Sequence, residues 1–133
     1  MRTTARETAF KVLFSAQFNE EFEDTRRSVF SLEKLEPDDV AYCNAVIKCV
    51  MEHREELAKI IDGHSRVFPE SRLFPADRSI LLIAIAEILY FDDIPSAVSV
   101  NEAANIASKY SSAKSASFIS GILSEIIREH DNV

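Results

Sequence analysis

The stretch Ala76 to Phe91, ADRSILLIAIAEILYF, decides the fold predicted for this chain. It is apolar on every face of the helix that it could form, and a helix without a polar face must be surrounded by other elements. Its unbroken apolar run, from Ile80 to Ala86, is much shorter than the ~20 residues needed to span a bilayer. We therefore expect a buried central helix in a protein that does not enter a membrane.

The length and composition of the chain fit one all-α domain over residues 1–133. Two glycines and four prolines are few for a sheet that needs many tight turns, whereas helix-forming residues dominate. The sequence has no internal repeat and no linker-like tract. We expect six or seven helices that share this domain.

Helical spacing of the apolar residues predicts where these helices lie. The expected ranges are 3–22, 25–35, 37–63 with a bend or break near His53 and Arg54, 76–91, 99–110 and 115–128. Ser99 and Glu102 have the spacing of a capping box, in which each side chain satisfies a backbone amide at a helix start. Gly121 lies inside the last range, where glycine costs up to ~1 kcal/mol relative to alanine. We expect it to permit the close approach of another helix.

The first helix has a wider apolar arc than one core face requires. Four phenylalanines follow one another at four-residue steps and form a second stripe: Phe10, Phe14, Phe18 and Phe22. Both stripes could face the core, or the aromatic stripe could cover a partner protein. A second copy of the chain, giving a homodimer, is an equal use of that surface.

The sequence offers no catalytic or metal-binding pattern. His53, His64 and His130 are scattered, and none pairs with a cysteine at ligand spacing. Cys43 and Cys49 lie six positions apart in a predicted helix, so they are expected to be buried thiols in a reducing compartment. We expect a protein that is not an enzyme and needs no cofactor or metal. No signal peptide follows the basic start, so a cytoplasmic location is expected.

The charge of the chain argues against broad nucleic-acid binding but leaves room for a local site. The net charge is −7, and such a field does not favour non-specific contact with polyanions. Arg2 and Arg6 nevertheless lie one helical turn apart, and Lys109 and Lys114 flank a polar break before Phe118. Cations beside an aromatic ring are the composition of a single-stranded RNA site. Solvated helix ends would show the same pattern, so both interpretations stay open at this point.

The order of several short motifs resembles the NusB family of transcription antitermination proteins along nearly the whole chain. The segments that carry the resemblance are Ala5-Arg6-Glu7, Asp77-Arg78-Ser79-Ile80-Leu81, Asp93-Ile94-Pro95, Val100-Asn101-Glu102-Ala103 and Phe118-Ile119-Ser120-Gly121. The resemblance implies two packed three-helix bundles and a function without catalysis. It implies binding to boxA single-stranded RNA together with a small-subunit ribosomal protein in the NusE role. That pair would join an RNA polymerase elongation complex and suppress premature termination in ribosomal RNA operons.

The resemblance also implies which residues of this chain would contact RNA. Arg2 and Arg6 correspond to the arginine-rich start of the family and would contact phosphates. Phe118 would be the stacking aromatic residue, with Lys114 and Ser115 at the adjoining helix start. Together with Lys109 from the charge pattern, these residues are the expected RNA site.

The expected partner surface consists of Phe14 from the aromatic stripe and Asp77 at the start of the central helix, which we expect to be exposed. Two departures from the family pattern weaken the expected RNA contacts, because Thr3 and Thr4 occupy positions that often carry arginine. An alternative is therefore an interaction module that binds the ribosomal protein with little RNA affinity. The RNA-guiding domain of a ribosomal RNA methyltransferase shares the fold, but a catalytic domain would be expected to follow Val133.

Overall fold

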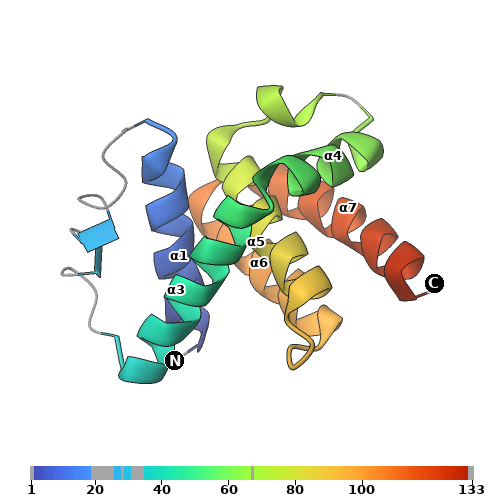
Figure 1. The fold of residues 1–133 in the computed structure, drawn as a ribbon. Helices are drawn as coiled ribbons and strands as arrows, with labels where there is room; N and C mark the ends of the chain where they lie inside the picture. The colour runs from blue at the N-terminus through green and yellow to red at the C-terminus, as the bar shows by residue number, and fades with distance from the viewer. Residues whose placement is uncertain (1, 19–25, 28, 31–34, 67, 132–133) are drawn as a thin grey trace.

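The computed structural model describes residues 2–18, 26–27, 29–30, 35–66 and 68–131. Within these ranges the chain forms six α-helices and a 3-10 turn, and no strand. They are α1 (Arg2–Ala16), α3 (Pro37–Glu52), α4 (Arg54–His64), the 3-10 turn Glu70–Arg72, α5 (Pro75–Tyr90), α6 (Ser96–Tyr110) and α7 (Ala113–Asp131) (Figure 1). The all-α class is confirmed. The short helix expected over 25–35 lies largely outside the described residues, as does Phe22.

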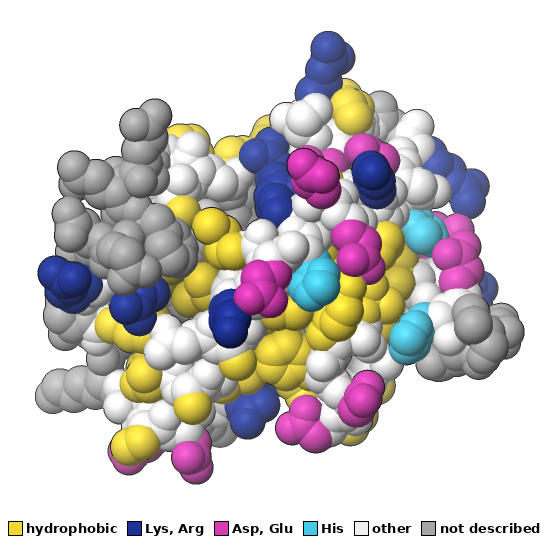
Figure 2. Space-filling model, viewed as in Figure 1, with side chains coloured by type: hydrophobic (Ala, Val, Ile, Leu, Met, Phe, Trp, Pro, Cys, Tyr) yellow, Lys and Arg dark blue, Asp and Glu magenta, His cyan; other side chains and the backbone are white. Residues whose placement is uncertain are grey.

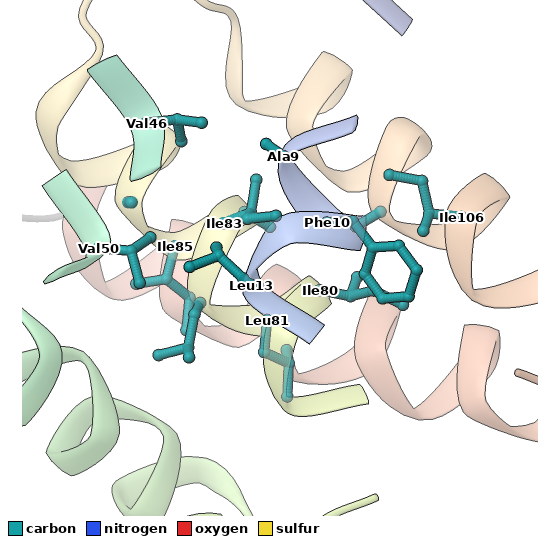
Figure 3. Packing of buried hydrophobic residues seen from close by; sticks show 14 of the residues in the cluster. Ala9, Phe10, Leu13, Val46, Val50, Ile80, Leu81, Ile83, Ile85 and Ile106 are labelled. Atoms are coloured by element: carbon teal, nitrogen blue, oxygen red, sulfur yellow. The ribbon is translucent and has the colours of Figure 1, made fainter. Parts of the chain in front are cut away.

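Helix α5 is the centre of the structure, as its sequence predicts. It packs against α1, α3, α4, α6 and α7, and it is buried on all faces between Ser79 and Ile88. Figure 3 shows the side chains that meet it from α1, α3 and α6: Ala9, Phe10, Leu13, Val46, Val50 and Ile106. Ile85 is fully buried, so its replacement by alanine is expected to cost about 2–5 kcal/mol. No helix in the described ranges is both long and apolar enough to cross a membrane.

The other helices form two groups around this centre. Helices α5, α6 and α7 pack against one another as the second three-helix bundle, and α1 packs against α3 in the first. The expected break in the long third helix is confirmed, because α3 ends at Glu52 and α4 begins at Arg54. His53 between them stacks on Tyr90 of α5, with ring centroids 4.2 Å apart. This contact ties the break to the central helix.

Two local predictions about the last helices are wrong. Helix α6 begins at Ser96, so Ser99 lies inside the helix and no capping box forms. The side chains of Ser99 and Glu102 bind other helices instead. Gly121 is exposed, and an added Cβ would meet nothing within 4 Å. No close helix contact therefore explains this glycine.

Candidate nucleic-acid interface

Arg6 lies in the core, although the sequence predicted that it contacts phosphates. Its side chain is only 4% exposed. Its Nε donates to Glu87 Oε2 at 2.7 Å, and its Nη1 donates to Glu102 Oε1 at 3.2 Å. The guanidinium thus bridges two carboxylates, one from α5 and one from α6. This burial and pairing do not favour the expected phosphate contact of Arg6, which stays a prediction.

Glu87 is the acceptor around which this buried group is built. It is 1% exposed, and besides Arg6 it receives hydrogen bonds from the hydroxyls of Tyr42 and Ser99, the latter at 2.8 Å. A buried carboxylate needs such partners, because an unpaired one is strongly destabilising. We call this group the Arg6 cluster; its members are Arg6, Tyr42, Glu87, Ser99 and Glu102. It joins α1, α3, α5 and α6.

Arg2, in contrast, stands at the surface at the start of α1. Its Cζ lies 4.5 Å from the centroid of the Tyr42 ring, and the residue is exposed. Within the described part of the chain it forms no ion pair. The neighbouring Thr3 donates its hydroxyl to Glu102 Oε1 at 2.7 Å. Arg2 is therefore a cation held at the surface without a counter-charge from the described residues.

Lys109 is exposed but already has a counter-charge. Its Nζ lies 3.1 Å and 3.2 Å from the two carboxylate oxygens of Glu7. The hydrogen bond to Glu7, and then the charge of Glu7, raise the pKa of the Lys109 ammonium. Tyr110 also donates its hydroxyl to Glu7, at 3.2 Å. A phosphate at this position would have to compete with Glu7.

Asp77 does not lie on the surface as the sequence predicted, since its side chain is 4% exposed. Its two oxygens accept hydrogen bonds from the hydroxyls of Ser111 and Ser115, each at 3.0 Å. Ser112 Oγ in turn accepts from the backbone N–H of Ser115 at 3.0 Å, near the start of α7. Asp77 therefore ties the turn between α6 and α7 to the start of α5. A direct contact between Asp77 and a partner protein does not fit this placement.

Ser115 is likewise turned inward. Its hydroxyl donates to Asp77, and the residue is 7% exposed. The expected RNA contact through this hydroxyl is therefore not supported by the structure. Ser115 and its exposed neighbour Lys114 both line a cavity.

That cavity lies where the α6–α7 turn meets the loop before α5, and its volume is about 560 Å³. Its lining is largely apolar and consists of Phe68, Arg72, Leu73, Phe74, Asp77, Lys114, Ser115 and Phe118. Lys114 is exposed and forms no ion pair among the described residues. Phe118 is half-buried beside it. The structure thus brings Lys114 and Phe118 together, as expected.

The sequence interpretation missed Phe68, Arg72 and Phe74 in this lining. Phe74 is 72% exposed, although it is a large apolar side chain. Each of the two phenylalanines directly precedes a proline in the loop before the central helix. An aromatic residue in such a polar, proline-containing loop was the available signal.

The two ends of the expected RNA site are separated along α5. Arg6 binds Glu87 near one end of this helix, whereas Phe118 shares a cavity with Asp77 at the other. Ten residues of α-helix span about 15 Å. Lys109 lies between them, because Glu7 follows Arg6 and Ser111 binds Asp77. The structure therefore does not bring all the expected RNA-binding residues together at one place: Lys114 and Phe118 share a cavity, whereas Arg2 lies over Tyr42 of α3 and Lys109 pairs with Glu7 of α1.

Phe14 belongs to a row of rings that runs along α1 and just past its end at Ala16. Its centroid lies 5.8 Å from that of Phe10 and 5.3 Å from that of Phe18, which is 67% exposed. Gln17 donates to the carbonyl of Pro75 at 3.0 Å, which fixes the end of α1 against the start of α5. The exposed ring at the end of this row therefore lies at the same end of α5 as Phe74.

The charged side chains on the face seen in Figure 2 do not form a broad basic surface. There, Lys and Arg side chains lie interspersed with Asp and Glu around a band of hydrophobic side chains. This distribution fits the net charge of −7. Polyanion binding at this face would lack the clustered cations that it needs.

Comparison with known proteins identifies the family. The NusB family model matches residues 3–128. Transcription antitermination protein NusB of Natranaerobius thermophilus is 35% identical over 132 residues, covering 96% of this chain and 95% of the relative. The solved structure of T. maritima NusB matches with a TM-score of 0.90 and 27% identity, covering 97% of this chain and 92% of that chain.

A second solved structure contains antitermination factors NusB and NusE in complex with dsRNA. It matches with a TM-score of 0.88 and 25% identity, and the match covers 96% of this chain and 96% of that chain. The family model and the identity to the relative both extend over nearly the full length. This chain therefore belongs to the NusB family.

Proposed function

We propose that this protein is a transcription antitermination factor. It binds the boxA element of nascent RNA together with a small-subunit ribosomal protein in the NusE role. The pair then joins the RNA polymerase elongation complex in the cytoplasm and suppresses premature termination in ribosomal RNA operons. The observation that carries this proposal is the family match over residues 3–128, and no catalytic step is part of it.

The exposed cations and one ring support RNA binding along α1 and the α6–α7 turn. Arg2 and Lys114 have no ion-pair partner within the described residues, so their charge is available to phosphates. Phe118 lies beside Lys114 at a largely apolar cavity of about 560 Å³, which is within the usual size of a small-ligand pocket. An unstacked base could stack on this ring while the lysine neutralises its phosphate. Lys109 contributes less, because Glu7 competes for it.

The aromatic row supports the protein partner. Phe14 on α1, Phe18 just after α1 and Phe74 before α5 present apolar rings at one end of the central helix. Aromatic residues are more frequent in protein interfaces than in the rest of the protein surface, and grouped exposed apolar side chains often mark an interface. Asp77 acts on this surface indirectly, by fixing the α6–α7 turn beside it. The same rings could instead pair two copies of the chain, and that homodimer would block the partner.

A second candidate is an interaction module that binds the ribosomal protein with little affinity for RNA. The burial of Arg6 favours it, because the arginine expected to be a phosphate contact serves the core. The net charge of −7 favours it as well. Only the RNA measurement separates the two candidates.

The test is a titration of fluorescent boxA RNA with this protein, alone and with the ribosomal partner, at several salt concentrations. A scrambled RNA of equal length is the control. We expect the partner to raise the affinity for boxA RNA more than for the scrambled RNA. Two phosphate contacts predict a logarithmic salt slope of about −1.4 for single-stranded RNA. Equal affinity for both RNAs with the partner present would reject the proposal, and partner binding without RNA binding would favour the interaction module.

A further inference from the structure

Tyr42 of α3 packs against the start of α1 and contacts both arginines of that helix. The Cζ of Arg2 is 4.5 Å from the centroid of the Tyr42 ring, and that of Arg6 is 5.5 Å from it. An arginine within about 6 Å of a ring centroid is attracted by the negative potential of the ring face. Tyr42 is buried, whereas Arg2 is exposed. The Arg2 side chain therefore packs against the face of the Tyr42 ring.

The Tyr42 ring is itself held from two directions. Its hydroxyl donates to Glu87 Oε2, the same oxygen that accepts from Arg6 Nε at 2.7 Å. Phe91 packs against it edge to face, with ring centroids 6.2 Å apart and an interplanar angle of 67°. A ring fixed at its hydroxyl and against another ring has few orientations available. It is a rigid support for the Arg2 guanidinium that lies over its face.

The backbone beside Arg2 is fixed as well. Thr3 donates its hydroxyl to Glu102 Oε1 at 2.7 Å, and Arg6 Nη1 donates to the same oxygen at 3.2 Å. These contacts anchor the first turn of α1 to α6. The Arg2 side chain thus leaves a fixed backbone and lies over a fixed ring, with no ion-pair partner within the described ranges.

We propose that Tyr42 is a positioning residue for RNA binding, whose ring holds the Arg2 guanidinium at the surface in readiness for a phosphate. This inference rests on the proposed RNA-binding function. A guanidinium lying over a ring uses its flat face, and its N–H donors point outward in its plane, where they can bind phosphate oxygens. A side chain that is ordered before binding loses less conformational entropy when the RNA arrives.

The test is a double-mutant cycle on boxA RNA affinity with Arg2→Ala, Tyr42→Leu and the double variant, in the presence of the ribosomal partner. We expect Tyr42→Leu to weaken binding about two- to fivefold, which corresponds to one exposed cation–π contact. In the Arg2→Ala background the same change is expected to have no further effect. Tyr42→Phe keeps the ring and is expected to restore binding to within twofold of the wild-type protein.

Tyr90→Leu is a matched control. The Tyr90 hydroxyl also donates to a glutamate, Glu56 at 2.7 Å, and its ring stacks on His53. It supports no arginine among the described residues, so RNA affinity is expected to be unchanged. Thermal unfolding of each variant establishes that it is folded at the titration temperature.

A Tyr42→Leu effect of equal size in both backgrounds would overturn the proposal, since it would then act through the fold and not through Arg2. A wild-type affinity for Tyr42→Leu, or for Arg2→Ala, would also overturn it, while boxA binding by the wild-type protein would leave the proposed function standing. NMR of the RNA-free protein gives a separate check. The Arg2 side-chain protons should be shifted upfield by the ring current in the wild-type protein and in Tyr42→Phe, but not in Tyr42→Leu. Unshifted Arg2 protons in the wild-type protein would overturn the positioning whatever the RNA result.

Discussion

The two ends of α5 each carry a buried carboxylate, and they satisfy it in different ways. Glu87 near the end of the helix is neutralised by Arg6, whose Nε lies 2.7 Å away. Asp77 at the start accepts only hydroxyl hydrogen bonds among the described residues, from Ser111 and Ser115 at 3.0 Å. One end therefore holds an ion pair, and at the other end the partners of the carboxyl group are neutral hydroxyls.

This difference determines which cations remain at the surface. At the Glu87 end Arg6 is buried in the core, whereas Arg2, one turn earlier on α1, is exposed. At the Asp77 end serine hydroxyls bind the carboxyl group. Lys114 is not used as its partner, and it lines the cavity as an exposed residue. A positive residue in the sequence is thus available to RNA only when no buried carboxylate requires it.

The largest effect is expected at the Glu87 end. Arg6→Leu should lower the free energy of unfolding by about 3–5 kcal/mol, because it leaves Glu87 buried without its cation. Urea denaturation measures this change. Arg2→Leu is the matched control and is expected to stay within about 0.5 kcal/mol of the wild-type value, as surface changes usually do. Equal effects of the two substitutions would contradict the assignment of Arg6 to the core.

A smaller effect is expected at the Asp77 end. Asp77→Ala leaves two serine hydroxyls without their acceptor and should lower the free energy of unfolding by about 1–3 kcal/mol. Asp77→Asn keeps one acceptor oxygen and should cost less than the alanine variant. The same denaturation experiment distinguishes them. An Asp77→Ala variant as unstable as Arg6→Leu would mean that the two carboxylates are satisfied alike.

Lys114→Ala should change RNA binding without changing stability. The loss of one phosphate contact should make the logarithmic salt slope for boxA RNA shallower by about 0.7. Lys109→Ala provides the comparison, because Glu7 already balances that lysine and its removal should change the slope less. Salt titrations by fluorescence anisotropy measure both slopes. Equal slopes for the two variants would show that Glu7 does not compete with phosphate.

The central helix was predictable from sequence, whereas the roles of its two buried carboxylates were not. An apolar run with no polar face has one placement, and Ile80 to Ala86 are buried as expected. Arg6 meets Glu87, a residue 81 positions away, and no local pattern reveals such a pair. Asp77 has the position of an exposed helix-start residue. It is covered in the structure by the α6–α7 turn, whose Ser111 lies 34 positions further along the sequence.

The surface proposed for the protein partner was predictable in part, through the four-residue spacing of its rings. Phe14 on α1 and Phe18 just after that helix lie next to each other, as the spacing predicts. Phe68 and Phe74 were not identified, because a loop has no periodicity from which to infer a face. Their position before the two prolines of that loop was the remaining signal.

The smallest effect on the free energy of unfolding is expected at an ion pair on the surface. Its contribution is the value with which those of the two buried carboxylates are compared. His64 of α4 lies 2.9 Å from Glu129 of α7, and the histidine also bonds the carbonyl of Ile60. Burial lowers the pKa of His64, but the hydrogen bonds to Ile60 and Glu129 and the charges of Glu129 and Glu125 outweigh it, so the pKa is raised.

A raised pKa in the folded state means that protonation of His64 favours folding. This stabilisation is fully present below the ordinary histidine pKa of 6.5 and is lost as the pH rises through the higher folded-state value. Because Glu129 is 70% exposed, the loss should not exceed about 1 kcal/mol. Urea denaturation at pH 5.5 and 8.5 measures it, with Glu129→Gln as the variant in which the difference shrinks. If Glu129→Gln kept the full pH dependence, the titrating group would lie elsewhere, and this pair would not serve as the surface reference for Glu87 and Asp77.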